Sequence, residues 1–458
     1  MGGFLFMSRL FGTDGVRGEA NLELTPELAY RMGRAATLYF GESCGDKQPV
    51  IIIGRDTRIS GQMFEAALMA GICSAGGKAV SAGIIPTPAI ALLTQKHQAQ
   101  AGIVISASHN PFHDNGIKFF GGNGYKLPDV VEDELENIVM AIENDDTLYR
   151  ASGAQMGTVE YRHDMIEEYI EFVLSTTKER FDGMKIVLDC ANGASYEAMP
   201  TILKSLGADL TVINAEPDGV NINDNCGSTH LEALQKKVLE LGADFGIAHD
   251  GDADRCLCVD EKGNVIDGDH MLVMCAKEMI ADGTLKDNTV VTTVMANIGF
   301  HKAVKELHGK AEITKVGDRY VLENMLANGY NLGGEQSGHI IFSDFSTTGD
   351  GPVTALQTLS SIKRSGKKAS ELNELMISYP QLLVNVVVKS KEGWEDNAKI
   401  AAAIKAGADE LGSEGRILVR PSGTEPLIRV MAEGPDQAQL EVICQKIADV
   451  VVAEQGAK

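Results

Sequence analysis

The stretch VIIIG at residues 50–54 begins a pattern that recurs along the chain. It is followed by QMFEAALMAGICSAG at 62–76, which reads as a helix, and by KAVSAG at 78–83, which reads as a second strand. Apolar runs without polar alternation are typical of strands in a sheet that helices cover on both faces. The stretch therefore predicts a strand–helix–strand unit with a right-handed crossover.

The same order of strand, helix and strand occurs twice more. The two further copies are KIVLD at 185–189, a helical segment at 198–206 and DLTVIN at 209–214, and then TVVTTV at 289–294, FHKAVKELH at 300–308 and AEITKV at 311–316. Chance repetition of ordinary units could produce such a pattern, but the regular order favours three related α/β domains.

The chain from about residue 380 has a different pattern. It reads as a strand, a helix, a hairpin-like pair and a terminal helix, at 382–390, 398–411, 415–434 and 437–455. This order predicts a small α+β domain after a linker at Tyr379 and Pro380, where Pro380 ends the preceding helix. The predicted division is three α/β domains at 1–165, 166–265 and 266–380 and an α+β domain at 381–458.

Charge and cysteine content limit the partners and the compartment. The chain has 64 Asp and Glu against 41 Lys and Arg, a formal net charge of -23. This balance argues against nucleic acid as the main partner, and an anionic substrate would need a local site of Arg and Lys. The eight cysteines form no CxxC pair, and no apolar run reaches about 18 residues. The first residues lack a positively charged segment and a long apolar one, so we do not expect a signal peptide. These features predict a cytoplasmic protein that does not bind membranes.

The stretch GIVISASHNPFHDNGIKFF at 102–120 places polar residues at the end of a buried strand. Pro111 cannot continue the strand, so Ser108, His109 and Asn110 are left at its end. Small residues beside Ser108 leave space for a bulky group on its hydroxyl oxygen. Serine alone is a poor nucleophile, so an ordinary turn serine is an equally good interpretation of this stretch by itself.

The stretch AHDGDADRCLCVDEKGNVI at 248–266 carries Asp250, Asp252 and Asp254 in alternation. A turning backbone can bring their carboxylates together, and three oxygen ligands without His or Cys suit Mg²⁺ better than zinc. A calcium-binding EF-hand loop is a rival, but its sixth position is Arg255 instead of Gly and its flanks read as strands. A solvated acidic loop is the other alternative.

Two further loops carry groups that suit a sugar phosphate. Arginine, hydroxyls and a flexible backbone at 418–430 can bind an anion, and a carboxylate with a hydroxyl at 332–342 suits sugar hydroxyls or an ammonium group. For each loop a polar turn without a ligand is the alternative. The candidate side chains are Arg420, Ser422, Gly423, Thr424 and Arg429 in the first loop and Glu335, Gln336, Ser337 and His339 in the second.

The order of these stretches resembles the α-D-phosphohexomutase superfamily over nearly the whole chain. The matching motifs are FGTDGVRG at 11–18, GRDTRISG at 54–61, ISASHNPFHDNGIKFF at 105–120, DGDADR at 250–255, GGEQSGH at 333–339 and RPSGTEPLIRV at 420–430. Three stretches, SASHNP, GGEQSGH and TKVGDRYV at 314–321, look most like the bacterial branch that acts on glucosamine phosphate.

The resemblance implies four domains around a central cleft, three related α/β domains with mixed sheets and a C-terminal α+β domain. It also implies that Ser108 carries a phosphoryl group and that one Mg²⁺ per subunit is bound by Asp250, Asp252, Asp254 and a phosphoserine oxygen. The sugar and its distal phosphate would be bound by the two loops at 335–339 and 420–429.

Further residues follow from the same resemblance. Arg17, Lys118 and Arg255 would stabilise the transferring phosphoryl group, because a loose phosphoryl-transfer transition state depends on positioning and charge. The general base would be Lys118 or His109, without a choice between them.

The implied activity is the interconversion of D-glucosamine 6-phosphate and α-D-glucosamine 1-phosphate through a 1,6-bisphosphate, toward UDP-N-acetylglucosamine and cell-wall precursors. Glucosamine or glucose 1,6-bisphosphate is expected as an activator, a kinase or autophosphorylation as the source of the first phosphoryl group, and a homodimer as a candidate assembly. A phosphoglucomutase or phosphomannomutase on the same scaffold is the nearest alternative. A sugar-phosphate sensor and a metal-dependent phosphatase are more distant ones.

Overall fold

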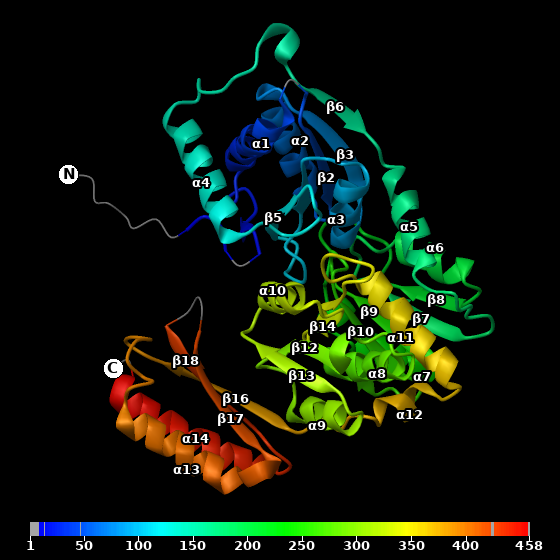
Figure 1. Ribbon diagram of the computed structural model, residues 1–458, viewed down its shortest axis with the longest axis vertical. Helices are drawn as coiled ribbons and strands as arrows, with labels where there is room; N and C mark the ends of the chain where they lie inside the picture. The colour runs from blue at the N-terminus through cyan, green and yellow to red at the C-terminus, as the bar shows by residue number, and fades with distance from the viewer. Residues whose placement is uncertain (1–8, 13, 46, 423–425, 457–458) are drawn as a thin grey trace. The chain divides into compact units, whose positions relative to one another are not determined.

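The computed structural model describes residues 9–12, 14–45, 47–422 and 426–456 (Figure 1). The chain divides into two compact units. The larger unit holds the chain up to Val294 together with Gly309–Glu374, and the smaller unit holds Met295–His308 and the chain from Leu375 onward. Among the described residues, three mixed sheets lie in the larger unit and one antiparallel sheet lies in the smaller unit.

The first sheet has the strand order β1-β5-β4-β2-β3-β6. Strands β2, β3, β4 and β6 are parallel, and β5 is antiparallel to β4 and β1. The strands are β1 (Val16–Glu19), β2 (Val50–Arg55), β3 (Lys78–Ile84), β4 (Ala101–Ile105), β5 (Asp114–Gly121) and β6 (Thr158–Tyr161). The helices of this region are α1 (Pro26–Gly41), α2 (Gly61–Ser74), α3 (Thr87–Lys96) and α4 (Asp129–Asn144). Every residue of β4 is buried, as its unbroken apolar run predicts.

The second sheet has the order β11-β10-β9-β7-β8. Strands β7, β8 and β9 are parallel, and β10 is antiparallel to β9 and β11. The elements are β7 (Lys185–Asp189), β8 (Asp209–Ile213), β9 (Phe245–His249), β10 (Cys256–Asp260), β11 (Val265–Ile266), α5 (Met165–Ser175), α6 (Ala198–Ser205) and α7 (Glu232–Leu241). The acidic loop lies between β9 and β10, so the EF-hand alternative, which needs flanking helices, is wrong.

The third sheet has the order β13-β12-β14-β15, with β15 antiparallel to β14 and the other pairs parallel. Its strands are β12 (Thr289–Thr293), β13 (Lys310–Thr314), β14 (Leu332–Gly334) and β15 (Ile340–Phe342). The helices of this part of the larger unit are α8 (Gly268–Ala281), α10 (Asp318–Asn328), α11 (Gly351–Ser365) and α12 (Ala369–Asn373). Helix α9 (Ile298–Glu306) connects β12 to β13 along the chain and belongs to the smaller unit.

The three mixed sheets share one topology. In each, a strand, helix, strand, helix and strand are followed directly by a fourth, antiparallel strand, and the spatial orders are β3-β2-β4-β5, β8-β7-β9-β10 and β13-β12-β14-β15. This agreement confirms the prediction of three related α/β domains with mixed sheets. The loop between the third and fourth strands carries the serine stretch in the first sheet, the aspartate stretch in the second and the GGEQSGH stretch in the third.

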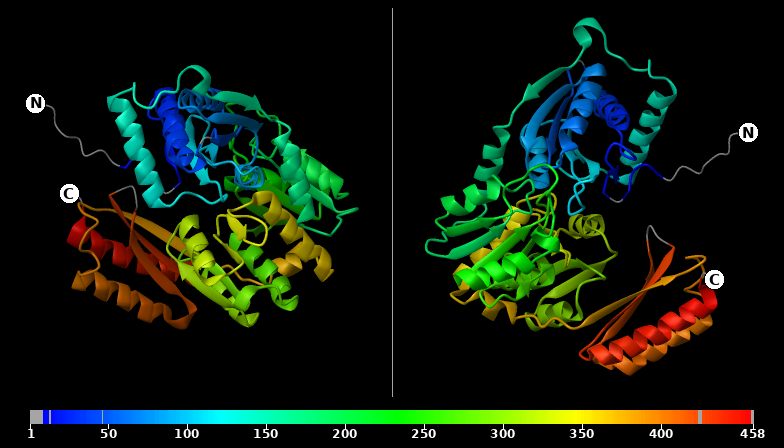
Figure 2. Two further views of the ribbon diagram at one scale, coloured as in Figure 1. Left: turned by 45° about the horizontal axis from the view of Figure 1, so that its top comes forward. Right: turned by 180° about the vertical axis from the view of Figure 1, so that it is seen from behind.

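The smaller unit contains the predicted α+β domain. Its antiparallel sheet has the order β16-β18-β17, and helices α13 and α14 cover one face of it (Figure 2). The bounds are β16 (Gln381–Val387), β17 (Arg416–Pro421), β18 (Leu427–Glu433), α13 (Ala398–Leu411) and α14 (Gln437–Gln455). Apolar side chains of the two helices and the sheet form a core of their own.

The chain before Pro380 differs from the prediction. The preceding helix, α12, already ends at Asn373 instead of continuing to Pro380. The backbone of Tyr379 exchanges two hydrogen bonds with the Asn297 side chain, each 3.0 Å long. These bonds hold the backbone of Tyr379, the residue before Pro380, which proline biases toward an extended conformation.

Helix ends follow capping rules. Thr25, Asp267 and Asp350 accept hydrogen bonds from backbone N–H groups in the first turns of α1, α8 and α11. Short 3-10 helices lie at Glu42–Cys44, Gly153–Gln155, Gly227–Thr229, Lys286–Asn288 and Gly412–Glu414.

All eight cysteines have free thiols. In the part of the chain that the structure describes, every helix is too short or too polar to cross a membrane.

Candidate active site

Ser108 lies in the loop that follows β4 and is only 2% exposed. Its backbone has a φ of 53°, in the left-handed region that residues with a side chain rarely adopt. Its N–H donates to Ser106 Oγ at 2.9 Å, and its Oγ donates to Asp250 Oδ2 at 2.5 Å. His109 Nδ1 lies 3.4 Å from the same Oγ. The hydroxyl therefore faces the aspartate loop of the second sheet.

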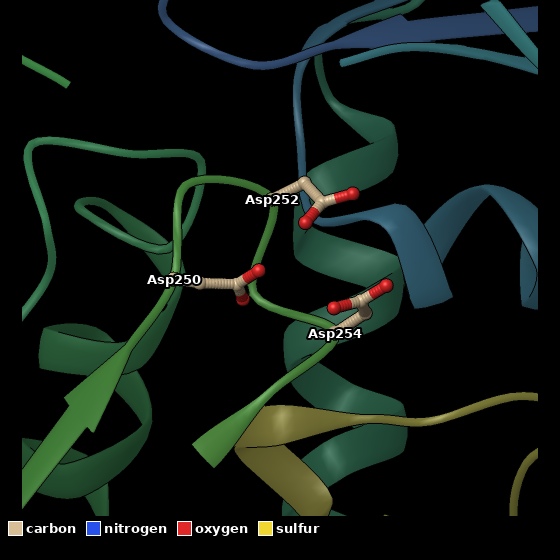
Figure 3. Close-up of side chains that lie close together, drawn as sticks. All are labelled: Asp250, Asp252 and Asp254. Atoms are coloured by element: carbon tan, nitrogen blue, oxygen red, sulfur yellow. The ribbon is translucent and has the colours of Figure 1, made fainter. Parts of the chain in front are cut away.

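The three aspartates of that loop converge (Figure 3). Asp250, Asp252 and Asp254 are buried, and one carboxylate oxygen from each lies within 4.8 Å of the others. Gly251 allows a close approach between the two loops, because a Cβ there would lie 2.6 Å from the carbonyl oxygen of Ser108. The predicted convergence of the carboxylates is confirmed, and the solvated acidic loop is excluded.

The charges of this triad fit a cation. Burial raises the pKa of Asp250 well above its usual value, and the charges of Asp254 and Asp252 raise it further. Among the described residues, Oδ1 of Asp252 and Oδ1 of Asp254 are buried without a hydrogen-bond partner. Buried carboxylate oxygens without partners are costly unless a cation binds them, and an all-oxygen set suits a hard divalent ion. The triad can therefore hold a metal ion.

Lys118 on β5 is buried beside this triad. Its Nζ lies 2.9 Å from Asp252 Oδ2 and 3.1 Å from Asp14 Oδ2. Burial disfavours the charged amine, but Asp14 and Asp252 outweigh it and raise the pKa of Lys118 above its usual value. Arg17 on β1 also reaches Asp14 Oδ2, at 2.5 Å. One carboxylate thus orients both predicted cations.

His109 and Arg255 differ in charge: the imidazole ring is neutral and the guanidinium group is positively charged. Burial and the nearby cations Arg255 and Arg17 lower the pKa of His109 to about 4, so its ring is neutral at neutral pH. Burial disfavours the charge of Arg255, but the carboxylates of Asp250 and Glu335, among others, raise its pKa above the usual value. Arg255 is therefore a cation that interacts with carboxylates of both the aspartate loop and the GGEQSGH loop.

The GGEQSGH loop between β14 and β15 presents polar side chains in a buried setting. Glu335 accepts a hydrogen bond from the N–H of Gly317 at 3.2 Å, and Gln336 donates to Asp267 at 3.1 Å. Burial raises the pKa of Glu335. Ser337 Oγ is buried without a hydrogen-bond partner among the described residues. Loop groups with unused hydrogen-bonding capacity suit a polar ligand.

A chain of charges links this loop to the serine site. Lys126 Nζ lies 2.7 Å from Asp14 Oδ1 and 2.5 Å from Asp318 Oδ2, and Asp318 Oδ2 lies 3.5 Å from His339 Nε2. Lys126, Asp318 and His339 line a cavity of about 530 Å³ in the larger unit. His339 therefore borders this cavity although it is only 4% exposed.

The loop of the smaller unit joins β17 to β18. Arg420 and Arg429 are opposite each other in the register of these strands, and burial together with the charge of Arg429 lowers the pKa of Arg420. Arg429 donates to Ser422 Oγ at 3.4 Å, and Lys391 donates to the carbonyl oxygen of Ser422 at 2.8 Å. The predicted residues Gly423 and Thr424 lie outside the described residues. The remaining side chains form a cationic site suited to an anion.

Several residues at these sites escape the sequence prediction. Asp14, Arg58 and Asp318 lie inside motifs that the sequence points to, but nothing in those motifs indicates their partners. The others are distant in sequence from the groups that they contact. The residues without a role in the prediction are Asp14, Arg58, Thr87, Lys126, Asn223, Asp318 and Lys391.

Four family models match the chain, and together they cover most of it. All describe phosphoglucomutase/phosphomannomutase: alpha/beta/alpha domains I, II and III match residues 8–146, 167–263 and 267–379, and the C-terminal domain matches 383–450. Solved structures share the fold, including the following two. A phosphoglucomutase/phosphomannomutase family protein from Burkholderia thailandensis has a TM-score of 0.79 at 24% identity over 97% of both chains. The N-acetylphosphoglucosamine mutase of Aspergillus fumigatus, in complex with GlcNAc-6P and magnesium, has a TM-score of 0.67 at 18% identity over 96% of this chain and 95% of that one.

Curated relatives are much more similar in sequence. The phosphoglucosamine mutase of Brevibacillus brevis is 54% identical over 97% of this chain and 99% of its own length. That of Clostridium novyi is 52% identical over 98% of this chain and 100% of its own length. The chain therefore belongs to the phosphoglucosamine mutases, an enzyme family within the phosphoglucomutase/phosphomannomutase group.

Proposed function

We propose that the protein converts D-glucosamine 6-phosphate into α-D-glucosamine 1-phosphate, and back, through phosphorylated Ser108. The observation that carries this proposal is the contact of Ser108 Oγ with Asp250 Oδ2 at 2.5 Å, inside a buried triad of aspartates. A serine at such a site can carry a phosphoryl group next to a bound cation. The activity makes the protein an isomerase that works as an intramolecular phosphotransferase.

In the first step the O1 hydroxyl of glucosamine 6-phosphate attacks the phosphorus of phosphoserine 108. The new bond joins O1 to phosphorus while the bond between phosphorus and Ser108 Oγ breaks, which leaves glucosamine 1,6-bisphosphate. The proton of the O1 hydroxyl goes to a base, and the serine oxygen takes up a proton. In the second step Ser108 Oγ gives up its proton and attacks the 6-phosphoryl group of the turned intermediate. The bond between O6 and phosphorus breaks, O6 takes up a proton, and glucosamine 1-phosphate is released from phosphoserine 108.

The residues around Ser108 supply charge and orientation. Lys118, Arg17 and Arg255 are cations held by carboxylates, and they can stabilise the non-bridging oxygens of the transferring group. Asp250, Asp252 and Asp254, together with a phosphoserine oxygen, would hold Mg²⁺, and the ion would neutralise part of the phosphoryl charge. We propose one such ion per subunit.

Two groups near Ser108 are candidates for the general base. His109 is neutral and lies 3.4 Å from Ser108 Oγ. Asp14 and Asp252 raise the pKa of Lys118, so the amine would have to lose a proton before it could act as a base. Comparison of the pH profiles of His109→Gln and Lys118→Met will separate them, because loss of the base removes its limb of the kcat profile.

The phosphate that does not react is proposed to bind the cationic loop of the smaller unit, at Arg420, Ser422, Gly423, Thr424 and Arg429. This site can hold either phosphate of the bisphosphate, so one site for chemistry suffices for both steps. Discrimination for the amino sugar is proposed to come from Glu335, with Gln336, Ser337 and His339 as further contacts. A carboxylate can form an ion pair with the C2 ammonium group of glucosamine, whereas the C2 hydroxyl group of glucose or mannose cannot form one.

The remaining expectations are also proposals. The domain bounds are 1–165, 166–265, 266–380 and 381–458. The protein is cytoplasmic, is activated by glucosamine or glucose 1,6-bisphosphate, receives its first phosphoryl group from a kinase or by autophosphorylation, and forms a homodimer. Its product feeds UDP-N-acetylglucosamine and peptidoglycan precursor synthesis.

A coupled assay of glucosamine 6-phosphate conversion tests the function. We expect activity that requires Mg²⁺ and increases with a sugar 1,6-bisphosphate. The nearest alternative is a phosphoglucomutase or phosphomannomutase, so kcat/KM is also measured with the 1-phosphates of glucosamine, glucose and mannose. A large preference for glucose or mannose 1-phosphate contradicts the amino-sugar assignment, and stoichiometric release of inorganic phosphate indicates a phosphatase instead.

A further inference from the structure

The backbone of the serine loop is held by two side chains that the proposed reaction does not use. Arg58 Nη2 donates to the carbonyl oxygens of Ser108 and Asn110, at 3.3 and 2.5 Å. Asn223 Nδ2 donates to the same two oxygens, at 2.9 and 3.0 Å. Each donor thus bridges the two carbonyl groups.

The two donors come from different sheets. Arg58 follows β2 of the first sheet, is 1% exposed, pairs with Asp56, and donates through Nε to the carbonyl oxygen of Asp114 at 2.8 Å. Asn223 lies between β8 and α7 of the second sheet and is 8% exposed, and its N–H donates to the carbonyl oxygen of Ala191 at 2.9 Å. Asn223 therefore connects the region of the second sheet to the serine loop of the first sheet.

The serine loop needs such support because of its backbone conformation. Ser108 is in the left-handed region, where a side chain is disfavoured and the surrounding structure must hold the residue in place. The same conformation determines where Oγ points. If the carbonyl groups were not held, the loop could relax toward ordinary backbone angles and Oγ would leave Asp250.

Asn223 also borders the aspartate loop. A Cβ at Gly251, between the ligands Asp250 and Asp252, would lie 2.6 Å from the carbonyl oxygen of Ser108 and 2.8 Å from Asn223 Nδ2. The amide of Asn223, the carbonyl of Ser108 and the backbone of Gly251 therefore pack against one another. A shift of any one of them changes the distance between Ser108 Oγ and the aspartates.

We propose that Asn223 is a positioning residue for phosphoryl transfer, which holds the carbonyl groups of Ser108 and Asn110 so that Ser108 Oγ stays directed at the aspartate triad. It acts through Ser108. The inference rests on the proposed function, because it requires that Ser108 carries the phosphoryl group.

The test compares Asn223→Gly with Asn225→Gly. Both asparagines have a positive φ, 59° and 51°, so glycine relieves backbone strain equally at the two positions. Asn225 is exposed, and its amide donates to Asp224. The pair therefore isolates the loss of the Asn223 amide. Asn223→Ala and Asn225→Ala repeat the comparison with a Cβ retained, in case the glycine variant folds poorly.

Two readouts are used: the rate of Ser108 phosphorylation by glucose 1,6-bisphosphate, from intact mass, and the separate values of kcat and KM for glucosamine 6-phosphate. For Asn223→Gly we expect a fall of about 10- to 100-fold in the phosphorylation rate and in kcat, with KM changed less than about threefold, because a small misplacement of reacting atoms costs rate before it costs binding. Asn225→Gly should have the same phosphorylation rate, kcat and KM as the wild-type protein.

Equal phosphorylation rates and equal kcat in the two glycine variants would overturn the inference, as would a change confined to KM. If the wild-type protein itself gains no phosphoryl group on Ser108, the proposed function fails, and the inference falls with it. These results are distinct, because in the first case the wild-type protein is phosphorylated and active.

Discussion

The serine–aspartate site of the larger unit and the arginine loop of the smaller unit are built from opposite charges. The first gathers Asp250, Asp252 and Asp254 in a buried site, each less than 6% exposed. The second places Arg420 and Arg429 opposite each other on neighbouring strands, and both are less deeply buried.

In each region like charges face one another, which is unfavourable without a partner of the other sign. The pKa values respond as expected: burial and neighbouring carboxylates raise that of Asp250, and burial and a neighbouring guanidinium lower that of Arg420. We therefore propose ligands of opposite charge for the two regions, a cation for the aspartates and a phosphate for the arginine loop. The aspartate region is also supported by a buried ion pair between Lys118 and Asp252.

The largest expected effect separates chemistry from binding. Ser108→Ala removes the proposed phosphoryl acceptor, so we expect kcat to fall by about 10⁴-fold or more, as it does when other enzymes lose their nucleophile. The coupled assay measures it. Serine 106, whose Oγ accepts from the Ser108 N–H, gives a neighbouring control, and Ser106→Ala should retain far more activity. Comparable activity of Ser108→Ala and the wild-type protein would contradict the assignment of chemistry to the serine–aspartate site.

Metal removal is the next test and acts only on the acidic region. Chelation with EDTA should lower kcat by about 10²-fold or more, because the transferring charge loses its neutralising partner. Mg²⁺ should also raise the melting temperature, since a ligand at 100 times its Kd stabilises the folded state by about 2.7 kcal/mol.

The matched variant for metal binding is Asp254→Asn, which removes one carboxylate charge from the triad. Differential scanning calorimetry should show a smaller Mg²⁺-induced rise for this variant than for the wild-type protein. An equal rise in both would place the metal elsewhere.

Arg420→Ala tests the basic region and should act on binding. We expect KM for glucosamine 6-phosphate to rise about 10- to 100-fold, because a hydrogen bond to a charged group contributes about 1.5–3 kcal/mol. Its melting temperature should stay level or rise slightly, because a facing like-charge pair costs about 0.2–1 kcal/mol. Lys405→Ala on α13, which removes an exposed ion pair with Asp409, is the control. An unchanged KM would contradict a role of Arg420 in binding the phosphate, and a large fall in melting temperature would indicate a structural role instead.

The smallest effect concerns the sugar. Glu335→Gln should lower the ratio of kcat/KM for glucosamine 1-phosphate to that for glucose 1-phosphate by about tenfold, the value of one charge-assisted hydrogen bond. Glu323→Gln on α10, which removes an exposed carboxylate that pairs with Arg319, serves as the control. A ratio unchanged by Glu335→Gln would assign amino-sugar recognition to another residue.

Local patterns predict much of the fold. The apolar runs at 50–54, 185–189 and 289–294 are strands β2, β7 and β12, and the predicted helices at 398–411 and 437–455 have the observed bounds of α13 and α14. Repetition of the strand–helix–strand order predicts the related domains, because each unit must bury the same two faces of a sheet. The antiparallel fourth strand of each sheet has no comparable local signature.

The candidate site is predictable where its residues are adjacent in sequence. Asp250, Asp252 and Asp254 share one turn, so their convergence follows from spacing. Contacts across the fold do not: Asn223 reaches the Ser108 loop over 115 positions, and Lys126 reaches Asp318 over 192. Such pairs depend on the order of strands within sheets and on the packing between sheets, which no local pattern specifies.

The central claim is that one phosphoryl group passes through Ser108. The direct measurement is to load the protein with glucosamine 1,6-bisphosphate, locate the phosphoryl group by peptide mass spectrometry, and then add glucosamine 6-phosphate. We predict one added phosphoryl group on Ser108, its transfer to the sugar at the rate of turnover, and the appearance of glucosamine 1-phosphate. A phosphoryl group on another residue, or turnover faster than its loss from Ser108, would contradict the account.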